Sequence, residues 1–355
     1  ISAHVPCIGP YQARPYKHLH NRRYQPIMHK VFVTRMIPQE GLDLLSTARF
    51  RLEVHANDNP ISRKELLNKV RDKDGLLCLL SEKIDKKLMD AGRSLRVIAN
   101  YAVGYDNIDV EEATRRGIIV TNTPGVLTEA TAEMAWALLF SISRRIVEAD
   151  RLMRETNGFR GWEPMLLLGE GVSGKTLGIV GAGRIGQAMA WMSKGFNMRV
   201  LYFSRSRKEN LEKDLNAKRV ELETLLKESD FVSLHVPLTP ETHHLIGARE
   251  LSLMKKTAYL INTARGPVVD EKALVDALRD KKIAGAGLDV YEDEPRLASG
   301  LRKLDNVVLA PHLGSATTET RRNMSIMAAE NLIAGLRGKT PKNVVNPEVF
   351  RAIKK

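Results

Sequence analysis

The sequence predicts an α/β fold composed of two doubly wound domains, each built on a parallel β-sheet. Short apolar runs alternate with helical patterns along the chain, and this alternation occurs in two separate blocks. In addition, a chain of 355 residues is too long for one ordinary hydrophobic core. A composition that is 43% hydrophobic is typical of a globular protein.

The first block supplies five expected strands, which are short apolar runs bounded by polar turns. These strands are expected at residues 30–34 (KVFVT), 50–55 (FRLEVH), 75–80 (GLLCLL), 96–100 (RVIAN) and 117–122 (GIIVTN). The helices between them are expected near residues 38–48, 62–71, 84–91 and 109–116. Strands that alternate with helices in this way form a parallel sheet with helices on both faces.

The second block repeats the same alternation with six expected strands. They are expected at residues 176–180 (TLGIV), 198–204 (MRVLYFS), 230–236 (DFVSLHV), 257–263 (TAYLINT), 284–290 (AGAGLDV) and 306–311 (NVVLAP). Helical patterns fall near residues 185–196, 221–228, 249–254 and 270–281. This block therefore predicts a second doubly wound domain.

Two longer helical patterns, at residues 128–155 and 316–336, flank the second block. We expect the chain to leave the first domain near residue 125 and to return to it near residue 312. The first domain would then be discontinuous and comprise residues 28–125 and 312–347, and the second would comprise residues 126–311. His312 would lie at the return crossing, where a cleft between the domains is expected.

Composition excludes several classes of protein. The longest apolar stretch, near residues 135–142, is far shorter than the roughly 20 residues that span a membrane. Cys7 and Cys78 are the only cysteines, which argues against a disulfide framework or a cysteine zinc site and favours a cytoplasmic location. The net charge of +13 comes from basic residues that often stand beside acidic ones, so we expect a solvated surface, with no nucleic-acid or membrane partner.

Residues 1–27 differ from the rest of the chain. They contain no acidic residue, four basic residues and four prolines. A transit peptide is basic and acid-free, but prolines disfavour its amphipathic helix. We therefore expect an extension outside the fold, with the folded chain starting near Met28.

Gly181, Gly183 and Gly186 form a G-x-G-x-x-G pattern in the segment GIVGAGRIG. The pattern is weak alone, because a glycine turn also occurs in α/β units that bind no ligand. Here it follows an expected strand and opens an expected helix, which is the context of a dinucleotide site. The glycines allow a tight turn, a close approach to pyrophosphate and close helix–strand packing, and the helix N-terminus faces the phosphates.

The end of the next strand bears on the choice of cofactor. NAD sites usually carry a carboxylate there, which binds the ribose 2′-hydroxyl. This chain instead has Ser204, Arg205 and Ser206. Hydroxyl and guanidinium groups suit a 2′-phosphate, so NADP is expected to be preferred, with NAD as a possible second cofactor. The alternative is a basic surface turn without selectivity.

Three further segments supply a guanidinium, a carboxylate and an imidazole: Arg265 in NTARG, Glu294 in EDEP and His312 in APHLG. Arginine can bind a carboxylate through two hydrogen bonds, and histidine can exchange a proton near neutral pH. Each residue alone is more often a surface or structural residue. Together, downstream of a dinucleotide loop, they predict reduction of a 2-keto acid.

Other polar residues are interpreted as structural. His235, His243 and His244 lack an HExxH pattern or matching carboxylates, so no metal is expected. Asp106 and Asp109 in VGYDNID are expected to cap a turn and a helix.

These segments together resemble the D-isomer-specific 2-hydroxyacid dehydrogenases, most closely their glyoxylate and hydroxypyruvate reductases. The resemblance covers about residues 28–347. It is carried by NYAVGYDNIDVEEATRRGIIVTNTPGVLTEATAE, GKTLGIVGAGRIGQAMA, HVPLTPETHHLIG, LINTARGPVVDEKAL, AGAGLDVYEDEP and LAPHLGSAT. It implies a mobile, flavodoxin-like substrate domain, a Rossmann cofactor domain and a cleft between them. It also implies a homodimer formed through the cofactor domain, with the 128–155 helix in the interface.

The resemblance also implies roles for individual residues. Arg265 would bind the carboxylate and carbonyl of a 2-keto acid such as glyoxylate or hydroxypyruvate, His312 would be the general acid, and Glu294 its partner. Backbone groups of Val103 and Gly104 would bind the carboxylate from the substrate domain. The expected cofactor contacts are Gly181, Ala182, Gly183, Arg184, Ile185, Gly186, Ser204, Arg205, Ser206, Val236, Pro237, Thr263, Ala264, Arg265, Asp289, His312, Leu313 and Gly314.

Substrate choice within the family stays open at this point. Phosphoglycerate dehydrogenases carry a basic residue where this chain has Tyr101, and formate dehydrogenases carry glutamine where it has Glu294. Small keto acids are therefore favoured, with another D-2-hydroxyacid dehydrogenase activity, of the D-lactate or phosphoglycerate type, as the alternative. Corepressors that sense the cofactor share this fold, but the chain lacks their long disordered C-terminal tail, so we expect an enzyme.

Overall fold

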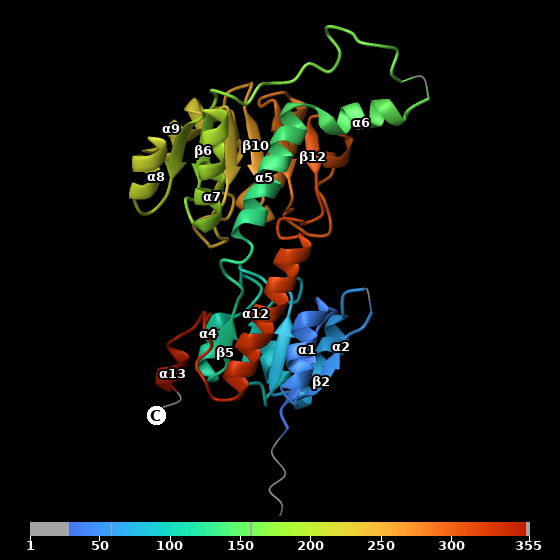
Figure 1. The fold of residues 1–355 in the computed structure, drawn as a ribbon, viewed down its shortest axis with the longest axis vertical. Coiled ribbons are helices and arrows are strands. Elements are labelled where there is room, and N and C mark those ends of the chain that lie inside the picture. Colours follow the sequence, from blue (N-terminus) through green and yellow to red (C-terminus); the bar gives the residue numbers. More distant parts are fainter. Residues whose placement is uncertain (1–27, 58, 157, 353–355) are drawn as a thin grey trace, which may run out of the picture.

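Two parallel sheets form the framework of the protein. The computed structural model describes residues 28–57, 59–156 and 158–352, so the expected extension at residues 1–27 lies outside the described residues. In Figure 1 the seven-stranded sheet lies above the five-stranded sheet, and each is covered by helices. The predicted fold class of two doubly wound α/β domains is therefore confirmed.

The five-stranded sheet has the order β2-β1-β3-β4-β5 with all pairs parallel. Its strands are β1 (Lys30–Val33), β2 (Arg51–Val54), β3 (Gly75–Cys78), β4 (Val97–Asn100) and β5 (Ile119–Thr121). Its connecting helices are α1 (Gln39–Thr47), α2 (Arg63–Lys69), α3 (Lys86–Ala91) and α4 (Val110–Arg115). Asp109 caps α4 as expected, because its carboxylate accepts a hydrogen bond from the Glu112 N–H.

The seven-stranded sheet has the order β12-β11-β10-β9-β6-β7-β8, also all parallel. Its strands are β6 (Thr176–Val180), β7 (Arg199–Phe203), β8 (Lys218–Arg219), β9 (Phe231–Leu234), β10 (Tyr259–Asn262), β11 (Gly285–Leu288) and β12 (Val307–Leu309). Its helices include α7 (Arg184–Met192), α8 (Glu209–Leu215), α9 (Leu222–Glu228), α10 (Ala248–Leu253) and α11 (Glu271–Arg279). β8 and α8 were not predicted, and for β8 the reason is that a two-residue edge strand is too short to give a periodic signal.

The predicted helix at residues 128–155 is wrong as a single element. It consists of α5 (Thr128–Ser143) and α6 (Ile146–Arg154), separated at Arg145, whose φ of 54° is left-handed. A continuous helix would direct the Ser143 carbonyl to the N–H four residues later. Here that carbonyl instead accepts a 2.8 Å hydrogen bond from Glu170 N–H, which directs α6 away from α5.

The C-terminal segment returns to the five-stranded sheet. Helix α12 (Thr318–Leu336) packs on α1 and β4, and the short α13 (Val349–Ala352) packs on α4. The Asn346 side chain accepts a hydrogen bond from the Val120 N–H of β5 at 2.8 Å. This packing supports the proposal that residues 28–125 and 312–347 form one domain and residues 126–311 the other. Among the described residues, every helix is too short or too polar to cross a membrane.

Candidate active site

The glycine loop joins β6 to α7, and its three glycines meet different surroundings. At Gly181, φ is +99° and an added Cβ would lie 2.8 Å from the backbone of His235. At Gly186, an added Cβ would lie 2.2 Å from the Gly181 carbonyl oxygen. At Gly183, which precedes the first turn of α7, an added Cβ meets nothing within 4 Å. The loop is therefore tightly packed on its protein side and open in front of the helix N-terminus, which fits a pyrophosphate.

The expected cofactor residues lie together at one edge of the seven-stranded sheet. They follow the carboxyl ends of six neighbouring strands, where ligands of open α/β sheets bind. Ala182 follows β6, Ser204–Ser206 follow β7, Val236 and Pro237 follow β9, Thr263 and Ala264 follow β10, Asp289 follows β11, and Leu313 and Gly314 follow β12. Arg184 and Ile185 begin α7.

The loop after β7 is held by an arginine that the sequence did not reveal. Arg219 donates from Nε to the Ser204 carbonyl at 3.0 Å and from Nη2 to the Arg205 carbonyl at 3.2 Å. Lys208 donates to the Ser206 hydroxyl at 2.9 Å. The nearby carboxylate of Glu212 is occupied by Tyr202 and Arg207, whose hydrogen bonds lower its pKa. The loop therefore presents basic and hydroxyl groups.

His312 and Glu294 form the central pair of the site. The imidazole Nδ1 lies 2.9 Å from Glu294 Oε2, and both side chains are about one third exposed or less. Burial alone would raise the pKa of Glu294, but the hydrogen bond and charge of His312, together with a hydrogen bond from Tyr291 N–H, hold that pKa below its usual value. The charge of Arg265 acts in the same direction. The three residues predicted from sequence therefore belong to one electrostatic site.

Asp289 supports the segment that carries His312. Its buried carboxylate accepts hydrogen bonds from the N–H groups of Leu313 at 2.6 Å and Gly314 at 2.7 Å, and its carbonyl accepts one from His312 N–H. Burial raises the pKa of Asp289 despite these hydrogen bonds. The arrangement fixes the backbone of His312, whose φ of 56° is left-handed.

Arg265 reaches from the loop after β10 to the other domain. Its Nε donates to Asp106 Oδ1 at 2.9 Å, and its Nη1 donates to the Ala264 carbonyl at 2.8 Å. The loop itself is fixed by Asn262, which accepts from Ala264 N–H and donates to the Arg265 carbonyl. The expectation that Asp106 caps a turn is therefore wrong, since its side chain pairs with Arg265.

The segment after β4 faces Arg265 from the five-stranded domain. Asn122 donates to the Val103 carbonyl and Asn100 to the Gly104 carbonyl, both at 2.7 Å. A carboxylate needs donors and carbonyl oxygens only accept, so the polar backbone groups that this loop can offer to a carboxylate are its N–H groups. Tyr101 is buried, and its hydroxyl donates to the Arg321 carbonyl in α12. Burial raises the pKa of Tyr101 to about 12, so this position contributes no charge at neutral pH.

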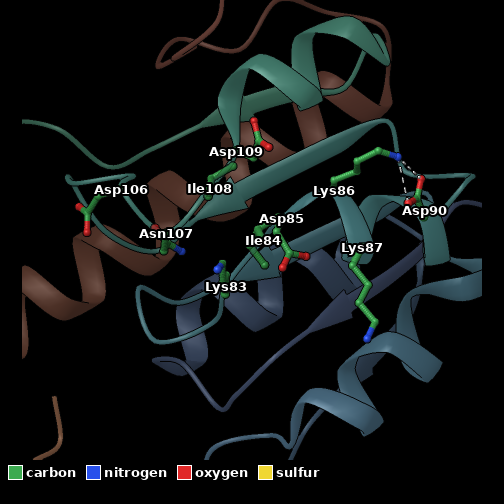
Figure 2. A pocket seen from close by; sticks show the side chains of 10 residues that line it. All are labelled: Lys83, Ile84, Asp85, Lys86, Lys87, Asp90, Asp106, Asn107, Ile108 and Asp109. Atoms are coloured by element: carbon green, nitrogen blue, oxygen red, sulfur yellow. Dashed lines mark hydrogen bonds and ion pairs between the residues drawn. The ribbon is translucent and has the colours of Figure 1, made fainter. Parts of the chain in front are cut away.

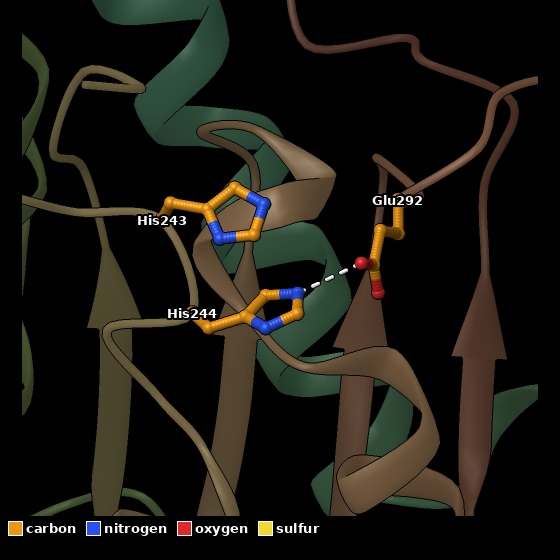
Figure 3. A group of neighbouring side chains, drawn as sticks. All are labelled: His243, His244 and Glu292. Atoms are coloured by element: carbon orange, nitrogen blue, oxygen red, sulfur yellow. Dashed lines mark hydrogen bonds and ion pairs between the residues drawn. The ribbon is translucent and has the colours of Figure 1, made fainter. Parts of the chain in front are cut away.

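The remaining histidines fall into two environments. His235 is half-buried beside Ser233, and the burial of its ring lowers its pKa to about 3, so it is neutral. The ring centroids of His243 and His244 lie 4.1 Å apart with the ring planes tilted by 31°, and His244 Nε2 lies 2.7 Å from Glu292 Oε1 (Figure 3). Glu292 is a neighbouring carboxylate that sequence spacing did not reveal. One ligand atom of each of these three residues lies within 4.8 Å of the others, so the absence of a metal stays a prediction.

Comparison with known proteins identifies a family to which this chain is similar. A model of the "D-isomer specific 2-hydroxyacid dehydrogenase, NAD binding domain" matches residues 136–314. Glyoxylate reductase of Thermococcus litoralis is 55% identical over 324 residues, which cover 90% of this chain and 98% of the relative. Glyoxylate reductase of Korarchaeum cryptofilum is 56% identical over 91% of this chain and 97% of the relative.

Solved structures agree with this similarity. A protein of Thermus thermophilus matches with a TM-score of 0.84 and 47% identity, covering 89% of this chain and 99% of its own. An NADPH-dependent glyoxylate/hydroxypyruvate reductase of Sinorhizobium meliloti, solved with NADP and malonate, matches with a TM-score of 0.78 and 34% identity. That match covers 90% of this chain and 97% of the other.

Proposed function

The chain belongs to the D-isomer-specific 2-hydroxyacid dehydrogenases, and we propose that it reduces glyoxylate and hydroxypyruvate to glycolate and D-glycerate with NADPH. The observation that carries this proposal is the 2.9 Å pair of His312 and Glu294, at the sheet edge that also carries the glycine loop and Arg265. The names of the relatives at 55% and 56% identity support the choice of glyoxylate within the family.

In this proposal each side chain has one chemical role. The nicotinamide of the bound cofactor supplies the hydride that reduces the keto carbon. Arg265 binds the substrate carboxylate and stabilises the negative charge that grows on the carbonyl oxygen. His312 donates a proton to that oxygen from Nε2, because Nδ1 is engaged by Glu294. Glu294 orients the imidazole through its 2.9 Å contact with Nδ1.

The preference for NADPH rests on the loop after β7. Arg205 and Ser206 are exposed there, and Arg219 fixes the backbone that carries them. A 2′-phosphate gains charge-assisted hydrogen bonds from such groups. The Sinorhizobium meliloti relative, which is described as NADPH-dependent, supports the same choice. NADH is expected to serve as a weaker alternative.

We further propose that the protein is a homodimer formed through the cofactor domain. Helix α6 and the segment that follows it project from the seven-stranded sheet (Figure 1) and expose several large apolar side chains. These are Ile146, Met153, Phe159, Trp162, Met165, Leu166 and Leu168, and we call them the apolar arm. Exposed apolar surface of this size is typical of an association surface.

A substrate panel tests the proposed activity. Purified protein should turn over glyoxylate and hydroxypyruvate with NADPH, and pyruvate more slowly. A much higher kcat/KM for 3-phosphoglycerate in the oxidative direction would contradict the choice of substrate. Cofactor binding without turnover of any keto acid would contradict the enzymatic role and favour cofactor sensing.

A further inference from the structure

We propose that Asp106 is a positioning residue that orients Arg265 toward the substrate carboxylate. The inference rests on the proposed role of Arg265. The two side chains come from different domains, since Asp106 follows β4 of the five-stranded sheet and Arg265 follows β10 of the seven-stranded sheet. Arg265 Nε lies 2.9 Å from Asp106 Oδ1, and the side chains are 19% and 33% exposed respectively.

The guanidinium of Arg265 is held by two hydrogen bonds and lies close to one glycine. Asp106 accepts from Nε and the Ala264 carbonyl accepts from Nη1. Nη2 lies directly over Gly104. A Cβ atom added to Gly104 would be only 1.8 Å from Nη2. The edge of the guanidinium that carries Nη2 is thereby directed at the Val103–Gly104 loop, whose N–H groups are expected to bind the same carboxylate. Gly104 gives the space for this approach and Asp106 sets its direction.

Asp106 lies on a loop that is held by hydrogen bonds of its neighbours. The side chain of Asn107 donates to the carbonyls of Leu79 and Glu82, both at 3.1 Å, and Asn100 donates to the Gly104 carbonyl. Asp106 lies at one end of a hollow of about 610 Å³, while Lys86 and Asp90 form an ion pair at the opposite end (Figure 2). The backbone that carries Asp106 is therefore held in place. Its carboxylate points away from the other acidic side chains of the hollow (Figure 2).

This geometry has a consequence for binding. A long arginine side chain has many rotamers, and a partner that fixes its plane reduces the freedom that substrate binding must remove. Nε donates to Asp106 and Nη1 to the Ala264 carbonyl, while Nη2 forms no hydrogen bond with the described residues and can donate to a carboxylate. Loss of the Asp106 charge should therefore weaken substrate binding and leave the cofactor site unchanged.

The test compares four variants of the full chain with NADPH bound: Asp106→Asn, Arg265→Lys, the double variant, and Asp90→Asn as a matched control. Asp90 is also a carboxylate of the same domain that pairs with an arginine, Arg116. For Asp106→Asn we expect the KM for glyoxylate and the Kd for oxalate, an unreactive two-carbon dicarboxylate, to rise by about tenfold. Turnover should fall less, and the Kd for NADPH and the melting temperature should match those of Asp90→Asn.

The double variant separates a positioning role from an independent one. If Asp106 acts through Arg265, adding Asp106→Asn to Arg265→Lys should change the oxalate Kd by less than about twofold. If Asp106→Asn raises the oxalate Kd equally in the parent protein and in Arg265→Lys, the inference is overturned. It is also overturned if Asp106→Asn leaves the KM for glyoxylate unchanged or lowers it while Arg265→Lys weakens binding. In those cases the proposed function stands. If Arg265→Lys itself leaves both constants unchanged, the proposed role of Arg265 is wrong and the inference fails with it.

Discussion

At the scale of single residues, the site depends on the contact between His312 and Glu294. The pKa of Glu294 lies below its usual value because the contacts with His312 and Tyr291 N–H and the charge of Arg265 together outweigh the effect of burial. A carboxylate whose pKa is lowered on folding adds stability above its ordinary pKa and loses it as pH falls through the lowered value. At neutral pH the pair is therefore fully formed, and acid weakens it.

Replacing His312 by Gln should lower turnover of glyoxylate by roughly 10²–10⁴, because the carbonyl oxygen loses its proton donor. The Kd for NADPH should change little, since the side chain acts at the substrate. Stopped-flow turnover and fluorescence titration of NADPH measure the two quantities. Turnover within about threefold of the parent protein would contradict the general-acid role.

Replacing Glu294 by Gln should lower turnover of glyoxylate less than replacing His312 does, because the imidazole keeps its place but loses the carboxylate that orients it at 2.9 Å. The pKa of Glu294 is lowered, so the parent protein keeps this carboxylate until the pH falls through the lowered value. The difference in turnover between parent and variant should therefore be full at neutral pH and shrink in acid. Equal turnover of the two proteins at neutral pH would show that the 2.9 Å contact does not orient His312.

Replacing Arg205 by Asp should raise the KM for NADPH roughly ten- to hundredfold and affect NADH much less. A charged hydrogen-bond partner contributes on the order of 1.5–3 kcal/mol, and only NADPH has the 2′-phosphate that needs it. Lys213→Asp, on the exposed face of α8, is a control with the same change of charge. Equal effects of Arg205→Asp on both cofactors would leave the NADPH preference without support.

At the scale of elements, sequence patterns predicted most strands but not the contacts between distant loops. The strands β6, β9 and β10 are buried apolar runs, so their position is encoded locally. The break at Arg145 depends on a hydrogen bond from Glu170, and the pairing of Asp106 with Arg265 joins residues far apart in the chain. No local pattern contains such contacts. The glycines of the loop after β6, His312 and Arg265 could be predicted, because each belongs to a short motif at the end of a strand.

The glycine loop gives a prediction that separates packing from binding. Gly186→Ala should destabilise the apoprotein by several degrees in melting temperature, because its Cβ would overlap the Gly181 carbonyl. Gly183→Ala should leave the melting temperature of the apoprotein within about 2 °C, since nothing lies within 4 Å of its Cβ. It should nevertheless weaken NADPH binding at least about tenfold, because the methyl group occupies the approach of the pyrophosphate. Normal NADPH binding by Gly183→Ala would place the pyrophosphate elsewhere.

At the scale of the whole molecule, the two domains meet through side chains that also form the site. Arg265 from the seven-stranded domain contacts Asp106 and Gly104 from the five-stranded domain, so the relative placement of the domains fixes the direction of the guanidinium. The apolar arm lies apart from this contact, in α6 and the segment after it, and within the described part of the chain no other domain covers it.

The apolar arm should hold two copies of the chain together. Trp162 is 85% exposed and Met165 75% exposed, and burying such side chains against a second copy removes apolar surface from water. Light scattering after size exclusion should give twice the chain mass of 39.7 kDa. Changing both Trp162 and Met165 to Glu should give a species of single-chain mass, because two carboxylates cannot be buried in an apolar interface without partners.

The control is Met36→Glu, which changes a side chain that is 49% exposed on the five-stranded domain. This variant should stay dimeric. A single-chain mass for the parent protein, or a dimer that survives both changes in the arm, would show that this surface does not join the two copies.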